Sequence, residues 1–421
     1  MNRSDRRRRH KAAAADAPGD AFDRAFQKAI AQESAGRTKQ AVRAYQTLIA
    51  KRPDAAAVRV RLGTLLGSAG DLLAAADQLE EAARLAPDDA YAHHNLGNVY
   101  ALQGRPRDAA AAFRRVLDLA PTMADAWLGL GGALKDAGET DDAVAALERA
   151  VAAAPDLADA HFLLGMLRYD AADPEPAARA LADALRHAPD HQRARFFLGM
   201  VRDQQGDAGA ARFHFDRLRP GPDGRVARRD SWDYVTAHRG PETRLFSTTF
   251  ATLADAFARA RPDGLVLEFG VRFATSLNFI AGLADGPVHG FDTFTGLPAS
   301  WRDEAAGTYT TGGALPPVAD NVSLHPGLFA ETLPGFLAAH DGPVRFVNMD
   351  CDLYESTKSA LDGIGPRLGP GSVIVFDEYL MHDNWREDEY RAFQEAVRAN
   401  GWTYDYVAFA PFTKQAAIRL R

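Results

Sequence analysis

Four carboxylates follow two apolar runs in the second half of the chain. Asp350 and Asp352 come directly after one run, and Asp377 and Glu378 come directly after the next. Carboxylates gathered at one place repel each other and need a cation or a shared proton. Mg²⁺ is bound by one or two carboxylates together with waters and substrate oxygens. The spacing therefore predicts a site for a hard divalent cation.

Two further acidic residues accompany earlier apolar runs. Glu268 precedes a turn that contains Gly270 and Ser276, and Asp292 ends the following run. A glycine-containing turn between strand and helix lets backbone amides approach a ligand, and an acidic residue there can receive an ammonium group. A carboxylate at the end of the second strand accepts the ribose hydroxyls of an adenosyl group. These four residues predict a cofactor site, although a plain tight turn and a helix cap would also fit.

The elements that must position these residues alternate between strand and helix. Apolar runs predict strands at 265–269, 288–291, 322–324, 344–349 and 372–376, with helices at 275–284, 332–340, 355–367 and 387–400. This rhythm predicts a doubly wound parallel sheet, in which ligands bind beyond the carboxyl ends of the strands. The last two runs, 403–408 and 416–420, have no helix between them and predict a terminal antiparallel pair at one edge. Such a pair is typical of Rossmann-like class I methyltransferases.

Three motifs together resemble the macrocin O-methyltransferase family over about residues 245–421. They are the Asp-x-Asp-Leu-Tyr-Glu-Ser-Thr run from Asp350, the Asp-Thr-Phe-x-Gly-Leu-Pro run from Asp292 and the late Asp-Glu-Tyr from Asp377. The stretch Gly327-Leu328-Phe329 with the following Thr-Leu-Pro is also similar. The resemblance implies methylation of a sugar hydroxyl with S-adenosylmethionine and Mg²⁺. It implies that Asp350, Asp377 and Glu378 bind the metal, although the family usually has Asp where this chain has Glu378.

Methyl transfer to a hydroxyl requires an in-line geometry and a group that takes the proton. A bound metal lowers the pKa of the hydroxyl and fixes its position. We expect Asp350 to act as ligand and base, with His382 as the rival base. Asp352 is expected to cap the helix that starts near Tyr354. An ordinary loop histidine is an equally simple interpretation of His382.

Residues 299–319 are long for a crossover and contain Trp301 and Tyr309, so we expect a substrate lid there. Two other functions stay open. The acceptor could be a phenol or catechol rather than a sugar. Alternatively, the chain could be an interaction scaffold whose sheet domain binds the cofactor without catalysis. That second alternative rests on Ala274 and Thr275, which stand where glycines are common in the cofactor turn.

The first half of the chain repeats itself every 34 residues. Leu-Gly pairs recur at this step from Leu62-Gly63 to Leu198-Gly199, and proline recurs from Pro53 to Pro189. Small residues let two helices approach closely, a glycine ends the first helix, and proline separates successive units. Alanine keeps the same step from Ala41 to Ala211, as does glycine from Gly36 to Gly206 apart from Ala172. These four periodic series resemble tetratricopeptide repeats over about residues 21–224, in six units. They predict an α-solenoid ahead of the α/β domain.

A repeat array of this kind presents a concave groove that typically binds a protein or peptide partner. Self-association into a homo-oligomer and a pure spacer role are the alternatives. Residues 219–231 contain two prolines and two glycines, which predicts a linker and a domain boundary near 225. The expected organisation is a basic, disordered tail at 1–20, repeats at 21–224 and a methyltransferase domain at 225–421.

The composition of the chain argues against several other classes of protein. The net charge of −7 gives no general attraction to nucleic acid, and only the arginine-rich start of the chain departs from it. No apolar run approaches the ~20 residues needed to cross a membrane, and no secretory h-region is present. With the single cysteine Cys351 no intramolecular disulfide can form. Together these features favour a cytoplasmic protein.

Overall fold

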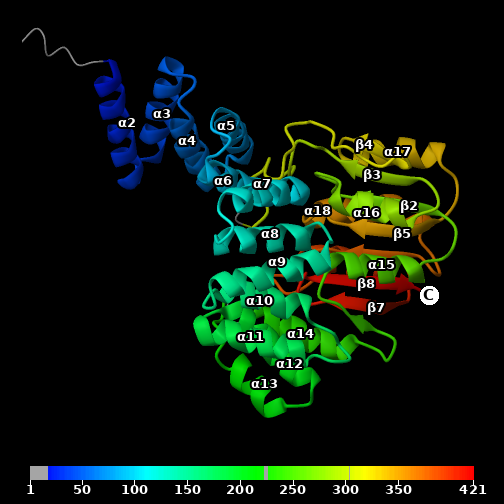
Figure 1. The fold of residues 1–421 in the computed structure, drawn as a ribbon. Coiled ribbons are helices and arrows are strands. Elements are labelled where there is room, and N and C mark those ends of the chain that lie inside the picture. The colour runs from blue at the N-terminus through cyan, green and yellow to red at the C-terminus, as the bar shows by residue number, and fades with distance from the viewer. Residues whose placement is uncertain (1–17, 222–225, 303) are drawn as a thin grey trace, which may run out of the picture. The chain divides into compact units, whose positions relative to one another are not determined.

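The computed structural model describes residues 18–221, 226–302 and 304–421 (Figure 1). The arginine-rich start of the chain and the centre of the predicted linker fall outside these residues. Helix α2 begins at Pro18, three residues inside the segment predicted as a tail. In the described ranges, no helix combines the length and the apolar character needed to cross a membrane.

Helices α2 to α13 form six successive helix pairs in the described part of the chain, the number of repeat units that the sequence predicts. Their bounds are α2 Pro18–Ser34, α3 Thr38–Lys51, α4 Ala56–Ser68, α5 Leu72–Leu85, α6 Ala90–Leu102, α7 Pro106–Leu119, α8 Ala124–Asp136, α9 Thr140–Ala153, α10 Ala158–Leu167, α11 Glu175–His187, α12 Gln192–Gln204 and α13 Ala208–Phe215.

Helix α8 shows why the periodic small residues matter. A Cβ on Gly131 would lie 2.5 Å from Cγ of Leu147 on α9, so a larger residue there would force the two helices apart. After α8 the chain turns at Gly138, whose φ of +83° is a left-handed conformation that glycine adopts without strain. The repeat pattern therefore encodes both the spacing and the turn of each helix pair.

The chain divides into two compact units. Among the described residues, one contains 18–103 and 108–121, and the other contains 104–107 and those from 122 onward. The second unit thus holds helices α8 to α13 together with the whole sheet. The division falls within the repeats, and the predicted boundary near 225 stays a prediction.

An eight-stranded sheet in the order β1-β7-β8-β6-β5-β2-β3-β4 forms the centre of the second unit. Its strands are β1 Arg244–Leu245, β2 Leu265–Phe269, β3 Val288–Asp292, β4 Val322–Pro326, β5 Val344–Met349, β6 Val373–Phe376, β7 Tyr404–Ala410 and β8 Gln415–Leu420. Strand β8 runs antiparallel to both β6 and β7, and the other pairs are parallel. The predicted fold class is confirmed, with one correction. The short strand β1 was missed, and it pairs with β7 outside the antiparallel pair.

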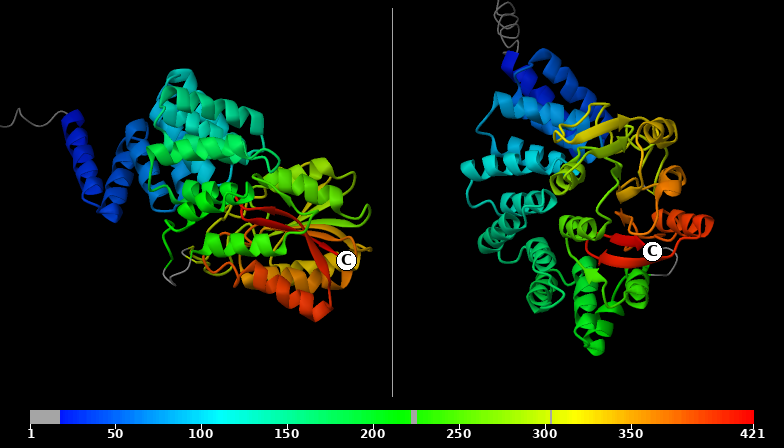
Figure 2. Two further views of the ribbon diagram at one scale, coloured as in Figure 1. Left: turned by 90° about the horizontal axis from the view of Figure 1, so that it is seen from below. Right: turned by 90° about the vertical axis from the view of Figure 1, so that its right-hand side faces the viewer.

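Helices cover both faces of this sheet (Figure 2). Helices α15 (Thr249–Arg259) and α16 (Thr275–Leu283) pack on one face through residues such as Phe257 and Leu277. Helices α17 (Phe329–Ala339), α18 (Tyr354–Ile364) and α19 (Glu389–Asn400) pack on the other. This three-layer arrangement leaves the carboxyl ends of the parallel strands free to build a site.

The last repeats share a hydrophobic core with the sheet. One cluster of buried side chains runs from α10 to α13 into the layer of α17 to α19. Helix α14 (Ala227–His238) joins the two, and the sequence missed it because its start lies inside the predicted linker. The indole of Trp232 donates to Asp203 on α12 at 2.8 Å, while the hydroxyl of Ser231 accepts the amide of Met381 at 2.8 Å.

Candidate functional site

A cavity of about 500 Å³ opens beyond the carboxyl ends of β2, β3, β5 and β6. Four of the predicted site residues line it, and they are Gly270, Asp292, Asp350 and Asp377. The other four are absent from its lining: Glu268, Ser276, Glu378 and His382. The cavity therefore brings together one predicted residue or more from each of the four strand ends that the sequence singled out.

Gly270 closes the gap between the ends of β2 and β5. Its φ is +88°, and a Cβ at this position would lie only 1.6 Å from the carbonyl oxygen of Asp350. A residue with a side chain cannot fit there, which is why glycine follows the strand. Further along the turn, Arg272 and Ala274 also have left-handed φ values of 49° and 59°. Each such residue with a Cβ costs roughly 1–2 kcal/mol, so the surrounding structure holds this turn in a strained shape.

Glu268 lies inside the sheet rather than on the cavity wall. It is fully buried and accepts hydrogen bonds from the hydroxyl of Ser276 and the amide of Asn348, each at 3.0 Å. Burial raises the pKa of Glu268 to about 8, against the smaller opposing effect of these two hydrogen bonds. The carboxyl group therefore links β2, α16 and β5, and its predicted contact with a ligand ammonium group stays a prediction.

Asp292 orders the turn after β2 from the neighbouring strand. Its Oδ2 accepts the amides of Val271 and Arg272 at 2.8 Å each, and its Oδ1 accepts the amide of Phe294 at 2.7 Å. Each carboxylate oxygen has two lone pairs, so Oδ1 keeps one for a ligand hydroxyl. Asp292 is thus both a wall of the cavity and the acceptor that orders two loops.

Three carboxylates line the cavity after the ends of β5 and β6. Asp350, Asp352 and Asp377 all line the cavity, and Asp377 also accepts the side-chain amide of Gln415 at 2.6 Å. Burial first, and then repulsion from the neighbouring carboxylates, raises the pKa of all three groups. The cluster therefore retains protons that isolated carboxylates would lose, unless a cation compensates the charge.

Asp352 is not the helix cap that the sequence suggested. The N-cap of α18 is Leu353, and no side chain caps that end of the helix. Asp352 instead has a left-handed φ of 59° and faces the cavity. Glu355 and Ser356 in the first turn of α18 also line it. The Asp-x-Asp spacing signalled two carboxylates here, but a left-handed residue that turns the second one inward has no sequence signature.

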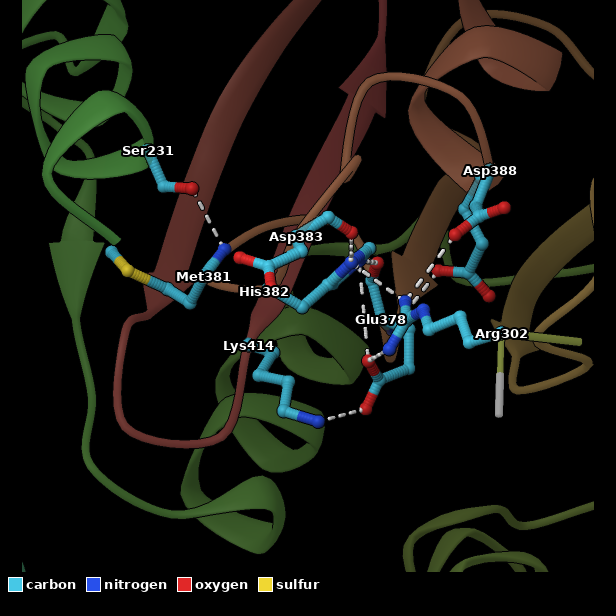
Figure 3. Close-up of polar contacts among 9 residues, drawn as sticks. Ser231, Arg302, Glu378, Met381, His382, Asp383, Asp388 and Lys414 are labelled. Atoms are coloured by element: carbon cyan, nitrogen blue, oxygen red, sulfur yellow. Dashed lines mark hydrogen bonds and ion pairs between the residues drawn. The ribbon is translucent and has the colours of Figure 1, made fainter. Parts of the chain in front are cut away.

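Glu378 lies in a network of cations beside the cavity (Figure 3). The ammonium of Lys414 donates to its Oε1 at 2.5 Å, and the guanidinium of Arg302 donates to its Oε2 at 3.3 Å. Arg302 also donates to Nδ1 of His382 at 2.6 Å and pairs with Asp388 at 3.3 Å. Glu378 is therefore neutralised by the protein's own cations.

His382 is buried in the same network. Its Nε2 lies 2.6 Å from the carbonyl oxygen of Glu378, so both ring nitrogens have protein partners. Burial, and then the charge of Arg302, lowers the pKa of His382. The ring is thus neutral at pH 7, but it lies outside the lining of the cavity.

The predicted lid contributes one side chain to the cavity wall. Tyr309 lines the cavity, and the guanidinium of Arg272 lies 4.8 Å from the centre of its ring. Arg302, in the same segment, stacks on Trp301 at 3.8 Å. Arg272, Glu355 and Ser356 are cavity residues that sequence reasoning did not single out.

The carboxylates fit a hard cation in part. Asp350 and Asp377 face the same cavity with raised pKa values, and a cation between them would relieve their repulsion. Glu378 is occupied by Lys414 and Arg302 in this arrangement. Among the described residues, no three His, Cys, Asp or Glu side chains are arranged to hold a metal ion.

Comparisons with known proteins address both halves of the chain. Residues 316–405 match the family model described as Macrocin-O-methyltransferase (TylF). Models described as Tetratricopeptide repeat match residues 26–90, 60–124, 100–167 and 162–225. The first match contains the ends of β5 and β6, and the others cover the helix pairs.

Two curated relatives are similar over short stretches. The chain is 45% identical over 62 residues to 8-demethyl-8-(2,3-dimethoxy-alpha-L-rhamnosyl)-tetracenomycin-C 4'-O-methyltransferase of Streptomyces olivaceus, covering 15% of this chain and 23% of that protein. It is 36% identical over 75 residues to demethyldecarbamoylnovobiocin O-methyltransferase of Streptomyces niveus, covering 17% of this chain and 28% of that protein. The chain thus spans about a quarter of the length of these relatives.

One solved structure among the similar ones is CalS11, a calicheamicin methyltransferase, at 26% identity and a TM-score of 0.33, covering 41% of this chain and 77% of that one.

The family matches and the motifs agree on the order of the two parts. The chain carries tetratricopeptide repeats followed by a macrocin-O-methyltransferase (TylF) domain.

Proposed function

We propose that this protein transfers a methyl group from S-adenosylmethionine to a hydroxyl of a sugar or glycosylated metabolite. The observation that carries the proposal is the cavity in which the turn at Gly270, Asp292 and the carboxylates of Asp350 and Asp377 meet. The family match over residues 316–405 includes both of these carboxylates. The printed name of the Streptomyces olivaceus relative, a 4'-O-methyltransferase of a rhamnosyl compound, supports a sugar acceptor.

Each wall of the cavity would have its own task. The turn at Gly270 would bring backbone amides against the cofactor, and Oδ1 of Asp292 would accept a ribose hydroxyl. Bound S-adenosylmethionine would supply the electrophilic methyl group, and bound Mg²⁺ would lower the pKa of the acceptor hydroxyl. Asp350 and Asp377 would hold the cation, and Glu378 would join them only if it left Lys414 and Arg302. We also propose that Glu378 can bind the metal and that Glu268 contacts the ammonium group of the cofactor.

The proton of the acceptor hydroxyl would pass to a carboxylate of the cavity wall. Asp350 is our candidate base because its carboxylate lines the cavity in which the acceptor hydroxyl would bind. His382 is the weaker candidate, since protein groups engage both of its ring nitrogens and it does not line the cavity. Tyr309 and the exposed Leu328 offer apolar surface on which a sugar ring or its aglycone would pack.

The repeats would recruit a protein or peptide partner. A hollow of about 450 Å³ on α9, α10 and α11 is lined by charged side chains, including Arg168, Arg179 and Asp183. A charged hollow suits a polar segment of a partner better than an apolar one. Pull-down with the full chain against variants in which Arg168 and Arg179 are replaced by Glu tests this part of the proposal.

A direct assay tests the enzymatic proposal. The full chain would be incubated with methyl-labelled S-adenosylmethionine and a panel of glycosides, phenols and catechols, with and without a chelator. We expect label in glycosides only, and only without chelator. Label confined to phenols or catechols would replace the sugar acceptor. Cofactor binding by calorimetry with no transfer to any acceptor would favour a scaffold.

A further inference from the structure

The turn between β7 and β8 reaches two parts of the molecule at once. Residues 411–414 connect Ala410 with Gln415, which pair across the hairpin. Lys414 has a left-handed φ of 71°, and its carbonyl oxygen accepts the amide of Leu380 at 3.2 Å. The turn is therefore tied to the chain segment that follows β6 and carries Asp377 and Glu378.

One side of the turn packs into the repeats. Phe412 is only 5% exposed, and its ring stacks on Phe197 of α12 with the centroids 4.1 Å apart and the planes at 12°. Its ring centre also lies 5.2 Å from that of Tyr169, which follows α10. The hydroxyl of Tyr169 exchanges hydrogen bonds with Gln204 at the end of α12. Phe412 thus fills a socket that the repeat helices α10 and α12 build.

The other side of the turn holds the acidic residues. Ala416 pairs with Phe376, so the next residues outward, Gln415 and Lys414, continue the strands opposite Asp377 and Glu378. Gln415 is fully buried and donates to Asp377 at 2.6 Å, and Lys414 donates to Glu378 at 2.5 Å. Lys414 at the end of the turn and Gln415 at the start of β8 therefore hold the two successive carboxylates that follow β6.

We propose that the β7–β8 turn positions the site carboxylates from the repeat array, with Phe412 as the positioning residue that the repeats hold in place. The catalytic part of this statement rests on the function proposed above. The repeats then serve the active site directly, because the helices that fix Phe412 also fix Lys414 and Gln415. A ligand that moved α10 or α12 would change the placement of Asp377 and Glu378 through Phe412, Lys414 and Gln415.

A small displacement of the site carboxylates would have a large effect on the rate of methyl transfer. Methyl transfer depends on alignment, and a misplacement of about 1 Å in a reacting group costs on the order of 100-fold in rate. Phe412 itself is remote from the chemistry, since it does not line the cavity. Its loss should therefore lower turnover without weakening cofactor binding, because the predicted cofactor residues lie on β2, β3 and the turn and helix between them.

The first experiment measures the link without any catalysis. Amide hydrogen exchange of the full chain is compared for wild type, Phe412→Ala and Phe113→Ala. Phe113 is the matched control because it is also a buried phenylalanine, and it packs on His94 in the repeat helices of the other compact unit. We expect Phe412→Ala to raise exchange in residues 377–382 by about tenfold or more, and Phe113→Ala to raise exchange in α6 and α7 alone.

The proposal would be overturned if Phe412→Ala raised amide exchange in α12 and left the exchange of residues 377–382 as in wild type. Equal increases at 377–382 in both variants would also overturn it, because any loss of repeat packing would then have the same effect. Should either alanine variant fail to fold by circular dichroism, Phe412→Leu and Phe113→Leu are compared in the same way. Lys414→Met calibrates the measurement, since it removes the contact with Glu378 and leaves the socket of Phe412 intact.

The second experiment uses turnover once an acceptor is known. Phe412→Ala should lower kcat by about 10- to 100-fold at an unchanged Kd for S-adenosylmethionine, and Phe412→Leu should recover most of it. Unchanged kcat in Phe412→Ala would refute the positioning role. If wild type transfers no methyl group to any acceptor, the proposed function fails, while the exchange result still decides whether the turn links the repeats to the carboxylates.

Discussion

Replacing Asp292 by asparagine should destabilise the turn at Gly270 and also weaken the binding of the cofactor. The carboxylate of Asp292 accepts three backbone amides, two on Oδ2 and one on Oδ1. An asparagine has only one acceptor oxygen. In its better orientation the oxygen faces Val271 and Arg272, and the NH₂ group then meets the amide of Phe294. At least one amide donor therefore loses its acceptor, which costs about 1–3 kcal/mol.

The same change removes the acceptor proposed for a ribose hydroxyl. We expect the Kd for S-adenosylmethionine to rise by about 5- to 150-fold, the equivalent of about 1–3 kcal/mol. Calorimetry gives the affinity, and thermal unfolding gives the loss of stability. Asp320→Asn is the matched control, because Asp320 is an exposed aspartate in the segment that connects β3 with β4. If Asp292→Asn behaves like Asp320→Asn in both measurements, Asp292 neither orders the turn nor binds the cofactor.

Three further outcomes follow from the site. Gly270→Ala should cost about 2–5 kcal/mol of unfolding free energy, from strain and overlap with Asp350, and wild-type stability in denaturant would show that the turn relaxes freely. Asp350→Asn and Asp377→Asn should each lower turnover by orders of magnitude at a nearly unchanged cofactor Kd, and full metal-independent activity of either would exclude it as a ligand. Glu268 has a pKa of about 8 when folded and near 4.5 when unfolded. Its contribution to stability is therefore lost as pH rises from about 5 to 8, and Glu268→Gln should become more stable relative to wild type across that range, as denaturant midpoints would show.

Much of the fold could be predicted because periodic patterns encode local structure. The 34-residue series fixed both the helix pairs and their turns, and the apolar runs located seven strands to within about two residues, a range within the normal scatter of element ends. Helix α14 and strand β1 were missed for physical reasons. The first residues of α14 follow a segment rich in proline and glycine, and β1 is two residues long, too short for any alternation to appear.

The positions of the candidate site residues could be predicted from the sequence, but the directions of their side chains depend on tertiary contacts. Strand ends placed Asp292, Asp350 and Asp377 at one cavity, because parallel strands share an edge. The same rule does not say which way a side chain turns. Asp352 faces the cavity through a left-handed backbone, and Glu378 turns to Lys414, which lies 36 residues later in the chain. That last contact depends on the register of β6 with β8, which no local pattern encodes.

The most direct test of the central claim is methyl transfer by the full chain from S-adenosylmethionine to a panel of glycosides, followed by mass spectrometry of the products. We expect a product heavier by one methyl group on a sugar hydroxyl, formed in the presence of Mg²⁺ and lost in Asp350→Asn. A methylated product that forms equally well in Asp350→Asn, or on no glycoside at all, would contradict it.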